Sequence, residues 1–277
     1  MSAPDVRALL AKYELRAKKS WGQNFLVEER AYREIVHACG LGEGDWVVEI
    51  GAGLGTLTAR LADAAAHVIA IERERDMLDI LGKELGDRPR VEIVAADALA
   101  FDYAAVAARA GRPPVVVGNL PYQIASPILF RLLEARHHIA RIVVMLQKEM
   151  VDRIVAAPGG KQYGALSVMV RLYGEPKLVC RVRAGGFIPA PRVDSAVLRI
   201  VPYAGGATKV AVDDRQFSRV VHAAFNQRRK TLRNALSAVF DIAAVDHALA
   251  AAAIDGQRRG ETLSVEEFAR VTGGLGA

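Results

Sequence analysis

The strongest constraint on the fold is an alternation of short apolar runs with amphipathic segments between residues 28 and 146. Helical periodicity occurs at residues 28–39, 57–65, 74–84 and 125–135. Runs rich in β-branched residues occur at Trp46–Ile50, His67–Ile71, Val91–Ala95, Pro114–Gly118 and Arg141–Leu146. Apolar strands that alternate with helices predict an α/β fold, in which a doubly wound parallel sheet is covered on both faces.

The pattern changes from about Gly174. Two strand-like runs, Lys177–Val182 and Ser195–Val201, flank a proline-rich turn and predict an antiparallel pair at the edge of the sheet. The stretch 203–209 has the composition of a linker, and the remainder predicts three or four helices. We therefore expect a first domain over residues 1–204 and a small helical domain over 205–277.

Composition limits the partners and the compartment. The net charge is +6 and the pI about 9.4, with Arg in excess over Lys, which makes nucleic acid the first partner to test. Cys39 and Cys180 lack disulfide or zinc spacing, and no metal site is expected. No signal peptide or membrane span is evident, so we expect a cytoplasmic protein without a membrane partner. The absence of an exposed heptad or apolar stripe favours a monomer.

Three features follow the first three predicted strands of the sheet. Gly51, Gly53 and Gly55 lie between a strand and a helix, where a nucleotide-like cofactor can approach the backbone. Glu72, 21 residues after Gly51, can accept both hydroxyls of a ribose, and Asp97 can accept an adenine amine. The spacing GxGxG differs from the dinucleotide fingerprint GxGxxG, which disfavours NAD without excluding it.

The fourth strand is followed by the turn Asn119-Leu120-Pro121-Tyr122. An adenine amine is a poor nucleophile because its lone pair is delocalised into the ring. The Asn119 oxygen and a backbone carbonyl of the Leu120–Pro121 turn could draw its hydrogens out of plane and direct the lone pair at a sulfonium methyl. Tyr122 could stack on a flipped base. In isolation, a polar turn with proline explains these residues equally well.

Eight segments together resemble the ribosomal RNA adenine dimethyltransferase family of the bacterial small-subunit type. They cover nearly the whole chain in the order typical of that family, and Gln123, Trp21 and Ala190 are small departures from its pattern. The segments are KKSWGQNFL at 18–26, EIGAGLGTLT at 49–58, IERERDM at 71–77, AADAL at 95–99, GNLPYQIASPILF at 118–130, MLQKEMVDRI at 145–154, FIPAPRVDSAV at 187–197 and FNQRRKTLRNAL at 225–236.

The resemblance implies a Rossmann-like S-adenosylmethionine methyltransferase sheet with a small C-terminal helical domain. It implies that Asn24 and Leu26 bind the cofactor, S-adenosyl-L-methionine, beside Gly51, Gly53, Glu72, Asp97 and Asn119. It also implies that Phe187 packs on the target base opposite Tyr122. The implied substrate is two adjacent adenosines in the terminal hairpin loop of 16S rRNA, within the small ribosomal subunit or its precursor. Each adenosine would be methylated twice on its N6 amine.

Two basic runs are candidates for RNA contacts, since phosphate binding needs clustered cations. They contribute Lys18, Lys19, Arg228, Arg229, Lys230 and Arg233. Three other functions stay open: a ribosome-assembly factor that acts mainly by binding, a large-subunit rRNA adenine methyltransferase, and a dehydrogenase. The GxGxG spacing disfavours the dehydrogenase, and Gln123 leaves the choice of target base open.

Overall fold

The computed structural model describes residues 4–15 and 24–275, which form two compact units. The first unit comprises residues 1–151 and 177–202, and the second comprises 152–176 and 203–277. The sequence assigned the segment Asp152–Pro176 to the first domain. It belongs instead with the C-terminal helices, because helix α8 (Ala165–Tyr173) packs on α9 (Asp214–Asn226) and α12 (Val265–Leu275).

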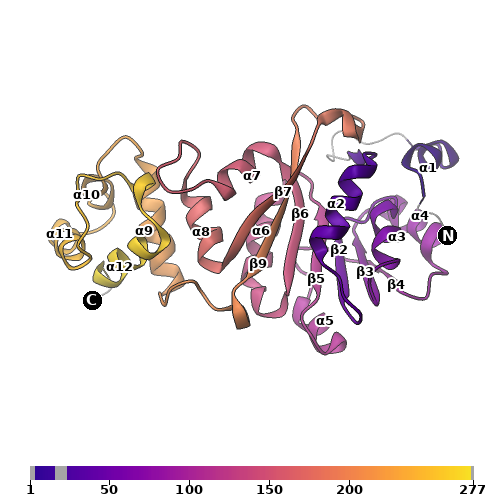
Figure 1. The fold of residues 1–277 in the computed structure, drawn as a ribbon, viewed down its shortest axis with the longest axis horizontal. Coiled ribbons are helices and arrows are strands. Elements are labelled where there is room, and N and C mark those ends of the chain that lie inside the picture. The colour runs from indigo at the N-terminus through magenta and orange to yellow at the C-terminus, as the bar shows by residue number, and fades with distance from the viewer. Residues whose placement is uncertain (1–3, 16–23, 276–277) are drawn as a thin grey trace. The chain divides into compact units, whose positions relative to one another are not determined.

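A seven-stranded mixed sheet forms the centre of the first unit (Figure 1). β2 pairs in parallel with β3 and β5, β3 with β4, and β5 with β6, whereas β9 is antiparallel to β6. The predicted parallel sheet with an antiparallel edge is therefore confirmed. In spatial order the strands are β4 (Val91–Ala95), β3 (His67–Glu72), β2 (Trp46–Ile50), β5 (Val115–Asn119), β6 (Arg141–Gln147), β9 (Ser195–Pro202) and β7 (Gly174–Val182).

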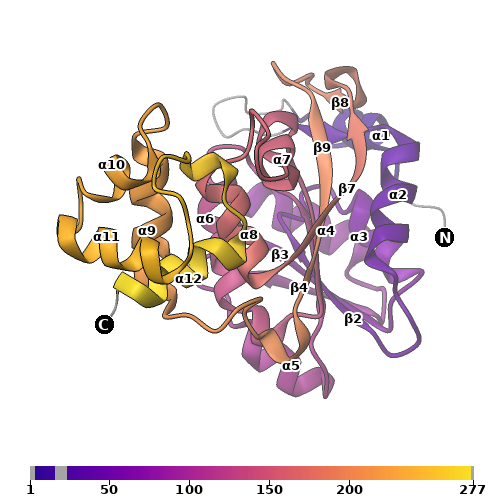
Figure 2. The same cartoon turned by 60° about the vertical axis from the view of Figure 1, so that its left-hand side comes forward.

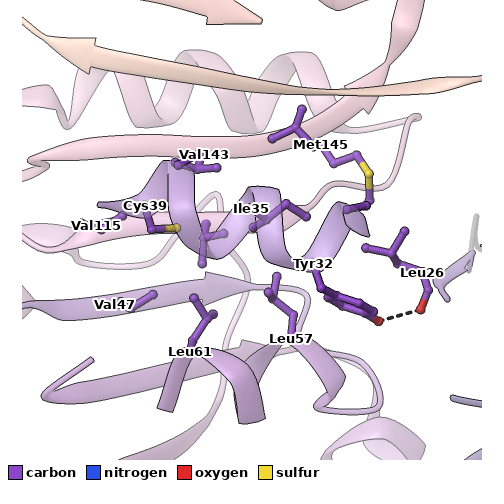
Figure 3. Packing of buried hydrophobic residues seen from close by; sticks show 14 of the residues in the cluster. Leu26, Tyr32, Ile35, Cys39, Val47, Leu57, Leu61, Val115, Val143 and Met145 are labelled. Carbon is purple, nitrogen blue, oxygen red and sulfur yellow. Dashed lines mark hydrogen bonds between the residues drawn. The ribbon is translucent and has the colours of Figure 1, made fainter. Parts of the chain in front are cut away.

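One face of this sheet is covered by α2 (Glu29–Cys39), α3 (Thr56–Ala62) and α4 (Arg75–Leu85). Figure 3 shows the apolar side of α2, including Ile35 and Cys39, against Val115 and Val143 of the sheet. Because crossovers between parallel strands are right-handed, reversal of the strand order after β4 sends α5 (Tyr103–Ala110) and α6 (Ala125–Glu134) to the opposite face. Helices therefore cover both faces of the sheet, and the strands between them are apolar on both sides, as the sequence predicted.

The strand order reverses between β2 and β5. The chain runs from β2 outward to β3 and β4, and then returns to place β5 on the other side of β2. Ile50 and Gly118 are register partners at the carboxyl ends of these two strands. Ligands of open α/β sheets bind at such a switch point, because the loops that leave the two strands diverge there.

Several elements were not predicted from the sequence. Helix α5 lies in an alanine-rich stretch with weak amphipathic contrast. The strands β1 (Phe25–Leu26) and β8 (Phe187–Ile188) are two residues each, too short for a periodic signal, and form a separate antiparallel pair. Helix α1 (Val6–Lys12) buries Val6 and Leu9 in a cluster with residues of α4.

The second unit is helical in its C-terminal stretch, as expected. Figure 2 shows α9 and α12 together with α10 (Leu232–Leu236) and α11 (Ile242–Ala251). Three aromatic rings pack together in this unit. The ring centroid of Phe268 lies 6.5 Å from that of Phe217 and 5.9 Å from that of Phe225. Asp213, Thr231 and Asp241 cap the first turns of α9, α10 and α11 with side-chain oxygens.

The β2–β5 pairing predicts a severe effect for Gly118→Ala. A Cβ at Gly118 would lie 2.6 Å from the Ile50 carbonyl oxygen, and a backbone atom in a central strand cannot move aside cheaply. We expect a loss of about 1–3 kcal/mol in unfolding free energy, measured by chemical denaturation. Gly82→Ala in α4, where a Cβ meets no atom within 4 Å, is the control and should stabilise by up to about 1 kcal/mol. Equal stability of the two variants would contradict the close approach.

Candidate functional site

A cavity of about 420 Å³ opens at the switch point of the first unit. Its walls come from the carboxyl ends of β2, β3 and β5 and from β1. The volume lies in the range of small-molecule sites. The sequence-predicted residues that line it are Asn24, Leu26, Gly51, Gly53, Glu72, Asp97, Asn119, Leu120, Pro121 and Tyr122.

The glycine loop is held to the end of β3 by Glu72. Gly51, Gly53 and Gly55 have φ values of 69°, 55° and 75°, a left-handed region that favours glycine. The Gly53 N–H donates to Glu72 Oε2 at 2.9 Å, and Oε1 accepts from the N–H groups of Arg73 and Glu74. The Glu72 carboxylate is thus fixed while its remaining lone pairs stay available to hydroxyl donors.

Asp97 lies at the next strand end and is more accessible. Its Oδ1 accepts from the Leu99 N–H at 2.9 Å, and its Oδ2 is 3.7 Å from Nη1 of Arg73. The side chain is 42% exposed and lines the cavity. It can therefore accept a hydrogen bond from a ligand amine.

The turn after β5 presents two acceptors. The Asn119 Nδ2 donates to the Asn24 carbonyl at 3.0 Å, which orients the amide and makes its oxygen the atom available to a ligand. The Ile124 N–H donates to the Pro121 carbonyl, so the Leu120 carbonyl is the better candidate for the second acceptor. The Leu120 N–H in turn donates to the Met145 carbonyl and fixes the turn on β6.

The β1–β8 pair joins two predicted site segments. Leu26 is the register partner of Phe187, and Phe25 of Ile188. Tyr32 donates to the Leu26 carbonyl at 2.6 Å (Figure 3) and hydrogen-bonds Thr56 at the start of α3. β1 is therefore tied both to the strand that carries Phe187 and to the helix that follows the glycine loop.

Phe187 is placed differently from the other predicted site residues. The residue is 3% exposed and packs in the hydrophobic cluster with Leu26, Tyr32 and Ile35. It is not among the residues that line the cavity. The geometry thus supports a packing role, and stacking on a base stays a prediction.

Glu49 is a site residue that the sequence reasoning missed. It lines the cavity, is 2% exposed, and its Oε2 has no hydrogen-bond partner among the described residues. Burial, with a smaller contribution from the nearby Glu72 carboxylate, raises the pKa of Glu49 to about 8, although the Thr58 hydroxyl acts to lower it. An acidic residue within the otherwise apolar strand Trp46–Ile50 was the signal that could have identified it. A buried carboxyl oxygen without a hydrogen-bond partner fits a cationic ligand in this cavity.

The predicted RNA-binding cations of the second unit fall into two classes. Arg228 donates to the carbonyls of Lys161 and Tyr163 and to Glu261, and Arg233 forms a two-pronged ion pair with Asp246. These two side chains hold loops and helices together. The second class is Arg229 and Lys230, exposed cations for which the described part of the chain offers no ion-pair partner. Lys18 and Lys19 lie outside the described residues.

No cluster of three or more metal-binding side chains occurs within residues 4–15 and 24–275. Over the same ranges, no helix combines the length and the hydropathy needed to cross a bilayer.

Comparisons with known proteins agree with this geometry. The family model described as "Ribosomal RNA adenine dimethylase" matches residues 14–274. The chain is 46% identical to ribosomal RNA small subunit methyltransferase A of Anaeromyxobacter dehalogenans, over 99% of this chain and 98% of the relative. It is 48% identical to the protein of the same name from Moorella thermoacetica, over 96% and 94% of the two chains.

Two solved structures share the fold. The 23S rRNA methyltransferase ErmE superposes with a TM-score of 0.72 at 26% identity, over 92% of this chain and all of that one. A dimethyladenosine transferase from Plasmodium falciparum has a TM-score of 0.76 at 24% identity, over 89% and 95% of the two chains. The expected methyltransferase fold is confirmed by these matches.

Glu49 predicts an unusual dependence of stability on pH. Because its folded-state pKa is raised, from 4.5 to about 8, the folded protein holds this proton where the unfolded chain has lost it. The contribution of this bound proton to the unfolding free energy is fully present below about pH 4.5 and is lost as pH rises to about 8. Glutamine does not titrate, so the unfolding free energy of Glu49→Gln should not fall in this way. The difference in unfolding free energy, variant minus wild type, should therefore rise between pH 5 and 8.5. At about 1.4 kcal/mol per pKa unit, the rise has an upper bound of about 5 kcal/mol.

The measurement is chemical denaturation of both proteins at several pH values in this range. Glu92→Gln is the matched control, because the Arg109 side chain lowers the pKa of Glu92. Its difference from wild type should not rise with pH. A difference for Glu49→Gln that is constant across the range would contradict the buried, protonated carboxyl.

Proposed function

Because the chain belongs to the ribosomal RNA adenine dimethylase family, we propose that it transfers methyl groups from S-adenosylmethionine to the N6 amines of two adjacent adenosines in 16S rRNA. The target is the terminal hairpin loop of the small ribosomal subunit or its precursor, where the modification accompanies subunit maturation in the cytoplasm. The observation that carries the proposal is the oriented Asn119 amide beside the Leu120 carbonyl, at the mouth of a nucleotide-sized cavity.

The cavity residues fit S-adenosylmethionine. Glu72 would accept the ribose hydroxyls and Asp97 the adenine amine, while the glycine loop with Gly51 and Gly53 lets the cofactor approach the backbone. Asn24 and Leu26 on β1 would cover it. The unpartnered Oε2 of Glu49 suits a group that carries positive charge. The chemistry that the cofactor supplies when bound is a methyl group made electrophilic by its sulfonium.

The turn after β5 prepares the adenine. The Asn119 Oδ1 and the Leu120 carbonyl would accept the two hydrogens of the target amine and turn its lone pair toward the cofactor. Pro121 fixes the turn and has no N–H to compete. Positioning does most of the work, and the proton leaves after transfer without a strong base. Tyr122 would stack on the flipped base, with Phe187 as the predicted second aromatic contact.

The choice between small and large ribosomal subunit follows from the degree of similarity. The relatives at 46–48% identity are named small subunit methyltransferases, whereas the structure named as a 23S rRNA methyltransferase is 26% identical. A role as an assembly factor without catalysis is disfavoured, because the Asn119, Glu72 and Asp97 side chains are all at the cavity.

We further propose that the second unit, which includes the predicted RNA-recognition domain over 205–277, binds rRNA through Arg229 and Lys230. Arg228 and Arg233 support this surface from their structural contacts. Lys18 and Lys19 stay predicted contacts on the leader. The reaction needs no metal, because the methyl is already activated by the sulfonium, and the protein acts as a monomer.

Asn119→Ala should reduce methyl transfer at least 100-fold, because the variant lacks the oriented acceptor. The measurement uses labelled S-adenosylmethionine, unmodified small ribosomal subunits and mass spectrometry of the RNA nucleosides. Asn119→Asp, which keeps an acceptor but cannot donate to the Asn24 carbonyl, should retain more activity than Asn119→Ala. Wild-type protein that binds subunits tightly but forms no dimethyladenosine would favour the assembly-factor function.

Replacement of Arg229 and Lys230 together by Ala should weaken subunit binding and reduce the salt dependence of the binding constant. Each lost phosphate contact lowers the slope of log K against log salt by about one. The control is the double variant Arg215→Ala and Arg219→Ala, which removes the same charge from α9 of the same unit. If the slope of log K against log salt falls equally in the two double variants, the effect comes from net charge in general and Arg229 and Lys230 do not form a docking surface.

A further inference from the structure

Ser195 carries a contact to which the proposed function assigns no role. It is the first residue of β9 and is fully buried, and its Oγ lies 2.7 Å from the Tyr122 hydroxyl. Tyr122 is half-buried and its side chain lines the cavity. A buried hydroxyl therefore holds the outer end of the ring that faces the candidate base site.

The support under Ser195 is rigid. Ser195 is the register partner of Gln147 in the antiparallel β6–β9 ladder. The preceding carbonyl, of Asp194, accepts from the Lys148 N–H at 2.9 Å. A hydroxyl on a strand that has a neighbour on each side can set the plane of a tyrosine ring, which otherwise has two free torsions.

Tyr122 needs such a support more than its neighbours in the turn. Asn119 is oriented by the Asn24 carbonyl and Leu120 is held by the Met145 carbonyl. The hydroxyl of Tyr122 has Ser195 as its partner in the described part of the chain. Burial raises the pKa of Tyr122, so the phenol stays neutral and can donate as well as accept.

Asp194, the residue before Ser195, holds the segment that leads into Phe187. Its Oδ1 accepts from the Ala184 N–H at 3.0 Å, in the 3₁₀ turn Ala184–Gly186 that directly precedes Phe187. The two consecutive residues thus hold the Tyr122 ring and the entry to β8. The sequence motif at 187–197 contains both of them, although its resemblance gave a role to Phe187 alone.

We propose that Ser195 is a positioning residue for methyl transfer, which holds the Tyr122 ring in the plane that receives the target adenine. The inference rests on the proposed function and names a residue that touches neither cofactor nor base. It acts through one hydroxyl pair, so the two residues of that pair must be energetically coupled in catalysis.

The test is a double-mutant cycle of Ser195→Ala and Tyr122→Phe, with methyl transfer to unmodified small subunits as the readout. Both variants remove one hydroxyl of the pair and leave the backbone and the ring. Each single variant should lower kcat about three- to tenfold, and the double variant should be no slower than the slower single one. Calorimetric binding of S-adenosylmethionine should change less than twofold in all three, because the pair faces the base and not the cofactor.

Ser167→Ala is the matched control for loss of a buried serine. Ser167 is also fully buried and donates to the Arg153 carbonyl in the second unit. It should lower the melting temperature as Ser195→Ala does, without the loss in kcat. If the two single effects on kcat multiply in the double variant, the residues are not coupled and the inference is overturned. A loss of cofactor affinity in Ser195→Ala as large as its loss of kcat would also overturn it. Inactive wild-type protein would instead refute the proposed function itself.

Discussion

The parallel pairing of β2 with β5 is the constraint on which the site depends. The register of Ile50 with Gly118 aligns the two strand ends, so the loop that begins at Gly51 and the turn that begins at Asn119 diverge from neighbouring points. The absent side chain at Gly118 lets the Ile50 carbonyl approach to a distance that a Cβ would forbid. The glycine loop and the turn after β5 are thus brought together by the sheet itself.

Around this pairing, short contacts close the site into one network. The Asn24 carbonyl fixes the Asn119 amide, Leu26 pairs with Phe187, and Ser195 holds Tyr122. Each contact joins segments that are distant in sequence. The glycine loop, the turn after β5 and β8 therefore share supports, and displacement of β1 would alter all three.

Three acids at the cavity differ in environment and hence in use. Glu72 is fixed by three N–H donors, which suits a carboxylate that receives hydroxyls in a set geometry. Asp97 is partly exposed and is satisfied on one oxygen by Leu99. Glu49 lacks a hydrogen-bond partner on Oε2 and burial raises its pKa, so it holds a proton, and a bound cation would lower that pKa and favour the ionised form.

The strands of the main sheet, the helices that correspond to α2, α3, α4 and α6, the glycine loop, Glu72, Asp97 and the turn at Asn119 were predictable from sequence. Each rests on local periodicity or on spacing along one strand and its loop, which a single chain displays directly. The β1–β8 pair, the burial of Phe187, the different roles of Arg228 and Arg229, and the contact of Ser195 with Tyr122 were decided by tertiary structure. These features depend on which distant segments meet, and a two-residue strand or a single hydroxyl leaves no periodic trace in the sequence.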